Sequence, residues 1–388
     1  MRPCTALIVV IAVATACQRP PKPGEPLRGL AAAERARFDS GRAVFDSVFT
    51  PETGLGPLFN ANGCGECHED PAVGGTGDEV ERHATAFHAV LTAAAGARPC
   101  DELAGQGGFV FQNHVTPLLH AALGIDSEPV PPAATAVGRR TIPEIFGFGL
   151  LDAVPDSEIL AYADPDDRDH DGISGRPNRF FDGRLGRFGR KALVPALREF
   201  NDGAFSAEQG VTTPAVPTEE TVAGTPVPAG TDPAPDPEIG EAKAALVTAF
   251  VRLLAPPAPL KRSREARQGK DVFARVGCAA CHRPSFTTGD SPIAALRHKE
   301  VDAYTDLLLH DMGPPLGDIC LALATPTEFR TEPLMGLHLK KNFLHDGRAT
   351  TVEQAIELHG GEAAKTRDSF RALAPGERAA LVAFLKTL

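Results

Sequence analysis

The chain has 388 residues, of which 43% are hydrophobic and 23% are charged, a composition typical of soluble globular proteins. A chain of this length usually forms more than one domain. Its net charge of −11 offers no basic surface to nucleic acid or to an anionic membrane, so we expect no nucleic-acid partner.

The N-terminal residues 1–17 predict an export signal. One positive charge at Arg2 precedes an apolar run, and small residues then lead to Cys17. This is the pattern of a secretory signal peptide. The cysteine at its end resembles a bacterial lipobox, which predicts lipidation of Cys17. The Pro-rich residues 18–30 are then a spacer, and we expect an exported protein on the periplasmic side that a lipid anchor alone holds to the membrane.

Two Cys-x-x-Cys-His motifs account for most of the other cysteines. They are Cys64-Gly-Glu-Cys67-His68 and Cys278-Ala-Ala-Cys281-His282. Two thiols at this spacing can bond to the two vinyl groups of one haem, and the histidine that follows supplies an imidazole to the iron. A zinc site would need a fourth ligand, and a thioredoxin-like dithiol would follow a strand. The motifs therefore predict two covalently bound haem c groups, with His68 and His282 as iron ligands.

Cys100 and Cys320 remain once the signal and the motifs are assigned. Disulfides form in the oxidising compartments that exported proteins enter. The two cysteines are therefore candidates for a disulfide, provided that their Cα atoms lie within about 7 Å of each other.

The surroundings of the two motifs repeat along the chain. The segments Gly41–Phe45 and Gly269–Phe273 each predict an amphipathic helix ahead of a motif. Farther on, two segments of the first half recur in the second: Arg140-Thr141-Ile-Pro143 as Arg330-Thr331-Glu-Pro333, and Phe180-Phe181-Asp182-Gly183-Arg184 as Leu344-His345-Asp346-Gly347-Arg348. The chain therefore reads as a diverged tandem of two haem units.

These features predict the domain organisation and the fold class. We expect an N-terminal haem c domain at 31–205, a Pro/Thr-rich linker at 206–238 and a C-terminal haem c domain at 239–388. Apolar residues recur at helical spacing in 239–254, 351–359 and 376–387, and strand signals are few. The prediction is a mainly α fold of two cytochrome c-like haem domains with long irregular loops and less than about a fifth strand.

Four longer segments resemble the bacterial di-haem oxidoreductase family, whose members are also labelled thiol oxidoreductases. The segments are Gly56–His68, Gly147–Pro155, Asp169–Asn178 and His345-Asp-Gly-Arg-Ala continued through His359-Gly-Gly-Glu-Ala. The resemblance extends over nearly the whole mature chain. It is more distant to the di-haem cytochrome c peroxidases, in which one haem stores an electron and the other meets peroxide or oxygen. The resemblance implies two haems and a peroxidase-like oxidoreductase.

The resemblance also indicates a sixth ligand for the second haem. In the peroxidases a Phe-His-Asp-Gly segment and a helix precede a distal methionine, whereas here Phe343-Leu-His345-Asp-Gly leads to His359. We predict His359 as this ligand, with Met312 as the alternative. A bis-His haem transfers electrons at a lower potential than a His/Met haem.

The first haem is the better candidate for the haem that reacts with substrate. His83 and His88 lie 15 and 20 residues after His68, where some of the similar peroxidases keep a displaceable distal histidine. A reacting site also needs a general acid or base, and Glu144 and Glu199 are the candidate catalytic carboxylates.

An electron path and a cation site complete the predicted site residues. The chain has no Trp to bridge the haems, so Phe181 and its repeat equivalent His345 are the candidate path residues. Asp167, Asp169 and Asp171 precede a glycine as in calcium loops, although no glutamate closes the loop, so we predict a candidate Ca²⁺ site there.

Together these features predict an exported di-haem c-type cytochrome oxidoreductase. One haem transfers electrons to or from a periplasmic partner protein, and the other reacts with peroxide or a related small oxidant. The alternative is a pure electron-transfer cytochrome that serves a partner protein. The enzyme needs one open or readily opened iron, whereas the carrier has two six-coordinate irons.

Overall fold

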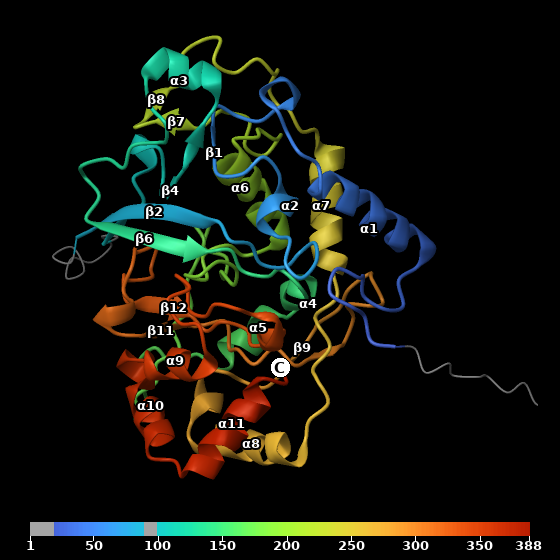
Figure 1. Ribbon diagram of the computed structural model, residues 1–388, viewed down its shortest axis with the longest axis vertical. Coiled ribbons are helices and arrows are strands. Elements are labelled where there is room, and N and C mark those ends of the chain that lie inside the picture. Colours follow the sequence, from blue (N-terminus) through green and yellow to red (C-terminus); the bar gives the residue numbers. More distant parts are fainter. Residues whose placement is uncertain (1–18, 89–98) are drawn as a thin grey trace, which may run out of the picture.

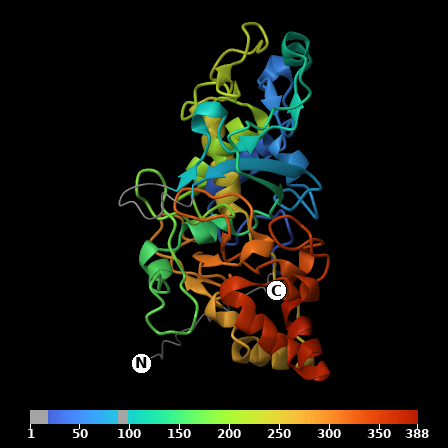
Figure 2. The same cartoon turned by 90° about the vertical axis from the view of Figure 1, so that its left-hand side faces the viewer.

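The computed structural model describes residues 19–88 and 99–388 (Figures 1 and 2). The predicted signal peptide and Cys17 lie outside the described residues. The structure is 32% helix and 14% strand, and the rest is turns and irregular segments. The coarse expectation of more helix than strand, with long irregular connections, is confirmed. No helix within the two described ranges is both long enough and apolar enough to cross a membrane.

The long helices α1 (Ala32–Phe45), α6 (Leu197–Gln209) and α7 (Glu241–Leu253) lie in the upper half of the molecule in Figure 1. The rings of Phe38 and Phe45 on α1 lie 5.0 and 4.9 Å from the ring of Phe250 on α7. Gly41 allows this contact, because a Cβ there would lie 2.1 Å from the carbonyl oxygen of Leu246. The sequence assigned α7 to the C-terminal domain, but α7 packs on α1 and α6 instead.

A twisted antiparallel sheet crosses the middle of the molecule (Figure 1). Its central strand β2 (Val80–Phe87) pairs with β3 (Cys100–Asp101), β4 (Val110–Phe111) and β6 (Ala136–Thr141). Thr85 on β2 contacts Cys320 of the C-terminal half, with 3.3 Å between Oγ1 and Sγ. One face of the sheet therefore packs against the C-terminal half.

A disulfide ties this sheet to the C-terminal half. It joins Cys100 to Cys320, whose Cα atoms are 5.7 Å apart although 220 residues separate them in sequence. The separation is within the limit that the candidate pair had to meet.

Two helices dominate the lower half of Figure 1: α8 (Arg264–Arg275) and α11 (Pro375–Leu385). A Cβ on Gly269 would lie 1.8 Å from the carbonyl oxygen of Ala380, so glycine is required where the two helices cross. Phe273 and Phe384 meet edge to face beside this crossing, 5.5 Å apart. Helix α8 ends directly before the second haem motif and so delivers it to the core.

The remaining elements are short. They are η1 (Pro51–Thr53), α2 (Cys64–Cys67), η3 (Ala104–Gln106), α3 (Pro117–Leu123), α4 (Phe148–Asp152), α5 (Asp156–Leu160), η4 (Cys278–Ala280), η5 (Pro314–Leu316), η6 (Leu337–Leu339), α9 (Val352–Glu357), η7 (Gly361–Ala363), α10 (Ala364–Arg371), and the strand pairs β1 (Leu58–Phe59) with β5 (His114–Val115), β7 (Thr221–Val222) with β8 (Thr225–Pro226), β9 (Phe286–Thr287) with β10 (Glu300–Val301), and β11 (Leu309–Asp311) with β12 (Glu328–Arg330).

The predicted linker 206–238 begins inside α6 and is partly packed. Thr212, Thr213 and Thr231 in this segment are buried. Thr212 also binds the carboxylates of Asp236 and Glu238, through its Oγ1 and, for Glu238, its backbone N–H. These contacts join the two ends of the segment, and the backbone N–H of Gly56 donates to the carbonyl of Gln209 at 3.0 Å, which ties the start of the segment to the N-terminal half.

Glu128 is a buried carboxyl that makes stability depend on pH. Its side chain is 1% exposed, and burial raises its pKa to about 8. As the pH rises from about 4.5 to 8, the unfolded chain loses a proton that the folded chain keeps, so the free energy of unfolding falls. We expect Glu128→Gln to remove this decline. The free energy of unfolding of the variant minus that of the parent should therefore be larger at pH 8 than at pH 5, by one to several kcal/mol, at about 1.4 kcal/mol for each pKa unit. Urea unfolding at both pH values measures this, and Glu158→Gln, an exposed site, should show no such difference.

Candidate functional site

The second motif opens into a cavity of about 240 Å³, hereafter the second-motif cavity. Cys278, Cys281 and His282 line it, and both predicted sixth ligands, His359 and Met312, line the same space. Much of the remaining wall is apolar, formed by Phe273, Leu334, Leu337, Val352, Ile356 and Leu385. The segment Thr141–Glu144 of the N-terminal half closes part of the wall, so both halves of the chain build this cavity.

The two histidines of this cavity are held in the same way. His282 donates Nδ1–H to the carbonyl of Tyr304 at 3.0 Å, and His359 donates Nδ1–H to the carbonyl of Ala355 at 2.7 Å. Because a carbonyl only accepts, the proton is on Nδ1 and Nε2 keeps its lone pair. Burial lowers the pKa of His282 to about 4 and also lowers the pKa of His359. Both imidazoles are therefore neutral, as an iron ligand must be.

The polar rim of the cavity carries more positive than negative charge. Arg190 and Arg330 both pair with Glu332, at 3.0 and 2.7 Å, and Lys340 pairs with Glu144 at 3.0 Å. Three cations thus face two carboxylates. A haem carries two propionates, so this rim, the apolar wall, the two thiols and the neutral imidazoles together fit a covalently attached haem.

The structure places the predicted catalytic residue Glu144 in this second cavity and not beside the first motif. Burial raises the pKa of Glu144, and its ion pair with Lys340 acts in the opposite direction. Its position in the chain explains this: Glu144 directly follows β6, which ends at the border between the two halves.

The first motif is anchored by the N-terminal helices. His68 donates Nδ1–H to the carbonyl of Gly75 at 2.9 Å, the arrangement also found at His282. Phe45 of α1 lies 5.9 Å from the His68 ring, and Gln209 at the end of α6 donates to the Cys64 sulfur at 3.0 Å. Burial lowers the pKa of His68, so this imidazole is neutral as well. The donor set again fits a haem.

Three carboxyls that the sequence analysis missed, those of Glu79, Glu81 and Glu208, lie beside the first motif. Burial raises the pKa of the Cys67 thiol, and the nearby charges of Glu79, Glu208 and Glu81 raise it further. Burial and the nearby Glu81 raise the pKa of Glu208 well above its usual range, and Asn60 donates to its Oε2 at 2.8 Å. Its surroundings therefore favour the protonated, uncharged form of the Glu208 carboxyl.

Glu199, the other predicted catalytic residue, lies away from the motif. It pairs with Arg184 at 2.7 Å near the start of α6, and both side chains are partly exposed. Glu208 and Gln209 lie at the other end of this helix, beside Cys64 and Cys67. Nine residues of helix separate Glu199 from Glu208, or about 14 Å.

The two candidate distal histidines differ in their surroundings. His83 is 5% exposed, its Nε2 contacts Glu81 at 2.9 Å and its Nδ1 is buried without a hydrogen-bond partner. His88 is exposed at the end of β2. Of the two, only His83 therefore lies in the interior with Glu81 and the first motif.

The two predicted path residues also differ. Phe181 is 49% exposed on a turn, beside Phe180. His345 is buried, lines the second-motif cavity and stacks on Phe329 with 4.4 Å between ring centroids. Its carbonyl accepts the N–H of Thr141 from the N-terminal half at 3.0 Å. Of the two residues, only His345 lies where the halves meet.

A protein-family model described as "Di-haem oxidoreductase, putative peroxidase" matches residues 132–388, about two thirds of the chain. The chain therefore belongs to the di-haem oxidoreductase family. The matched range contains the second motif and its cavity, whereas the first motif lies ahead of it. Membership implies haem cofactors and oxidoreductase chemistry.

Three solved structures are similar to this di-haem oxidoreductase at low sequence identity. Hydrazine synthase of Kuenenia stuttgartiensis is 14% identical, with a TM-score of 0.38 over 99% of this chain and 100% of that one. The diheme peroxidase BthA of Burkholderia thailandensis E264 is 15% identical, with a TM-score of 0.43 over 91% and 86%. A MauG-like protein associated with microbial copper homeostasis is 20% identical, with a TM-score of 0.27 over 38% and 52%. The search of curated proteins found no match.

The candidate calcium loop of this di-haem oxidoreductase brings its three carboxylates together. One oxygen each of Asp167, Asp169 and Asp171 lies within 4.8 Å of the others, and the loop is largely exposed. A second group of this kind, which the sequence analysis did not identify, is formed by Glu219, Asp232, Asp236 and Glu238.

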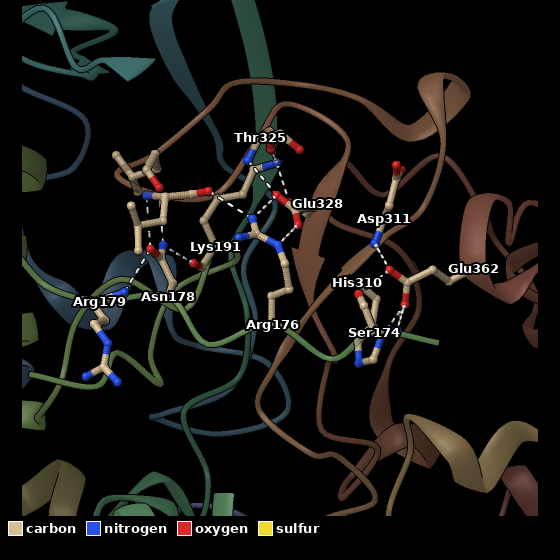
Figure 3. Close-up of polar contacts among 12 residues, drawn as sticks. Ser174, Arg176, Asn178, Arg179, Lys191, His310, Asp311, Thr325, Glu328 and Glu362 are labelled. Atoms are coloured by element: carbon tan, nitrogen blue, oxygen red, sulfur yellow. Dashed lines mark hydrogen bonds and ion pairs between the residues drawn. The ribbon is translucent and has the colours of Figure 1, made fainter. Parts of the chain in front are cut away.

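Hydrogen bonds connect the segment after the candidate calcium loop to the wall of the second-motif cavity (Figure 3). Ser174, at its end, donates Oγ–H to Glu362 at 2.7 Å. Glu362 and Asp306 each contact a ring nitrogen of buried His310 at 2.8 Å. Burial alone would lower the pKa of His310, but these hydrogen bonds raise it well above its usual value. A charged imidazole thus forms part of the cavity wall.

Proposed function

We propose that this chain is an exported di-haem c-type cytochrome oxidoreductase, with a periplasmic protein as electron donor or acceptor. In this proposal Cys64, Cys67, Cys278 and Cys281 carry the two haems. The second haem transfers electrons, and the first reacts with peroxide or a related small oxidant. Family membership supports the haem cofactors and the reaction class, and the sequence supports export.

The observation that carries the division of roles is the pair of neutral histidines in the second-motif cavity. His282 and His359 each present Nε2 after binding a carbonyl through Nδ1. Two such ligands close an iron to substrate and leave it to electron transfer. Met312 lines the same cavity and remains the alternative sixth ligand.

The first site combines a proximal histidine with a carboxyl whose surroundings favour its protonated form. Haem supplies one-electron redox chemistry and a coordination position for a small oxidant. In this proposal Glu208 carries the proton, because its surroundings raise the pKa of its carboxyl, and Asn60 orients that carboxyl by donating to Oε2. A proton held beside the reacting centre is what cleavage of a peroxide requires. We therefore propose Glu208 as the acid of this site in place of Glu144 and Glu199.

A second candidate function, pure electron transfer, is favoured by one observation. The buried Nδ1 of His83 has no hydrogen-bond partner. If the ring turned toward the first haem, its iron would be closed as well. Both haems would then only carry electrons.

Electron paramagnetic resonance and optical spectra of the haem-loaded protein separate these functions. In the oxidised or half-reduced state we expect one low-spin bis-His haem and one high-spin haem, and a spectral change at one haem on adding cyanide or peroxide. His359→Ala should convert the low-spin haem to high spin, whereas Met312→Leu should leave it unchanged. Two low-spin haems in both states, without response to either reagent, would favour the electron carrier.

A further inference from the structure

A buried lysine lies directly behind the wall of the second-motif cavity. Lys191 is 0% exposed, and its Nζ lies within hydrogen-bond distance of three backbone carbonyls, those of Thr325, Pro326 and Glu328, at 3.2, 2.9 and 2.6 Å. Figure 3 shows Lys191 beside Thr325 and Glu328. Asp318 lies 3.0 Å from the same nitrogen. These four acceptors offer a partner to each of the three N–H groups of an ammonium ion.

The ammonium group also lies on an aromatic ring that lines the cavity. Nζ is 3.6 Å from the ring centroid of Phe329, and the imidazole of His345 stacks on the same ring at 4.4 Å with an interplanar angle of 24°. Two groups this close to one ring cannot share a face, so Lys191 and His345 lie on opposite faces. Phe329 and His345 both line the cavity, so the Phe329 ring separates the ammonium group from the cavity.

The charges around Lys191 leave a net positive charge at this place. Asp318 is shared between Lys191 and Arg140, whose Nη2 lies 2.9 Å from its Oδ2. Glu328 is neutralised by Arg176 at 2.6 Å. The two cations Lys191 and Arg140 therefore share the single carboxylate of Asp318, which leaves one positive charge in excess. In a buried setting, salt and water screen such a charge only weakly.

We propose that Lys191 is a positioning residue that holds the Phe329–His345 pair in the cavity wall and raises the reduction potential of the second haem. A cation near a haem stabilises its reduced form, which carries one positive charge fewer. The inference rests on the proposed function, in which this haem is the one that transfers electrons. It assigns a potential-setting role to a residue that is neither an iron ligand nor in the cavity lining.

The test is a spectroelectrochemical titration of both haems at pH 6. Burial lowers the pKa of Lys191 to about 7, with Asp318 acting in the opposite direction, so the group is charged at this pH. In Lys191→Gln, which keeps two N–H donors for the carbonyls, the midpoint potential of the second haem should fall while that of the first changes little. Lys191→Arg keeps the charge and should restore most of the potential. Lys386→Met, which removes an exposed cation from the same half, should shift neither haem.

Three outcomes would overturn the inference. They are an unchanged second-haem potential in folded Lys191→Gln, an equal shift of both haems, and a shift in Lys386→Met of the same size. If Lys191→Gln does not fold, Arg140→Gln removes one charge from the same cluster and should lower the same potential. The parent spectrum keeps the two claims apart: without a low-spin bis-His haem the proposed function fails, whereas with that haem and an unshifted potential only the role of Lys191 fails.

Discussion

Replacing Glu208 by glutamine is expected to lower the rate constant for reaction with hydrogen peroxide by about 10²-fold or more, the range for loss of a general acid. Burial and Glu81 raise the pKa of Glu208 and so favour its protonated form beside Cys67, and Asn60 donates to its Oε2. Glutamine keeps the size and the acceptor for Asn60 but cannot give up a proton. Stopped-flow absorbance of the haem after mixing with peroxide measures the rate, and an unchanged haem content would show that the site is intact.

Glu199→Gln is the matched control, because it makes the same change in the same helix. Its partner is Arg184 and its side chain is partly exposed, so we expect the peroxide rate to stay within about twofold of the parent. Equal losses in the two variants would mean that the helix and not the acid is responsible. An unchanged rate in Glu208→Gln would remove Glu208 from the reaction.

The helices were the part of the fold that the sequence revealed best. Apolar residues recur at helical spacing in 239–254, 351–359 and 376–387, and the structure has α7, α9 and α11 there. Most apolar side chains of α7 and α11 are buried, and α9 buries Val352. The long strand β2 gave no such signal. Arg82 on it binds Asn113 and the carbonyl of Gln112, and Glu81 and His83 bind each other, so polar side chains leave both faces without apolar alternation.

The site shows a similar division between local and long-range information. Cys278, Cys281 and His282 lie close together in sequence, as the proposed covalent attachment of a haem requires, so spacing alone identifies them as candidates. Glu208 lies far along the chain from Cys67 and reaches it only because α6 packs in the N-terminal core. Nearness to a motif in the sequence led to the prediction of Glu144 and Glu199, and it could not point to Glu208, the acid that we propose from the packing of α6.

Removing the Asp318 carboxylate is expected to lower the free energy of unfolding by about 3–5 kcal/mol, the usual cost of leaving buried charges without a partner. Asp318 binds Arg140 of β6 at 2.9 Å and Lys191 at 3.0 Å, and the three side chains are 3%, 7% and 0% exposed. Burial alone would raise the pKa of Asp318, but these two cations lower it, so the carboxylate is charged in the folded protein. Asp318→Ala leaves Arg140 and Lys191 without their carboxylate at the border of the halves, and urea unfolding at pH 6, where Lys191 is charged in the parent, measures the loss.

The control is Asp39→Ala, which breaks the exposed pair with Arg35 on α1 and should cost less than about 1 kcal/mol. A loss below about 1 kcal/mol in Asp318→Ala would mean that water reaches the cluster and that its charges are screened. That result would also weaken the case for Lys191, because the same cluster must be dry for a cation behind Phe329 to act on the neighbouring cavity. The unfolding of Asp318→Ala and the redox titration of Lys191→Gln therefore test the same physical condition by independent means. That condition is a low local dielectric constant at the border between the halves.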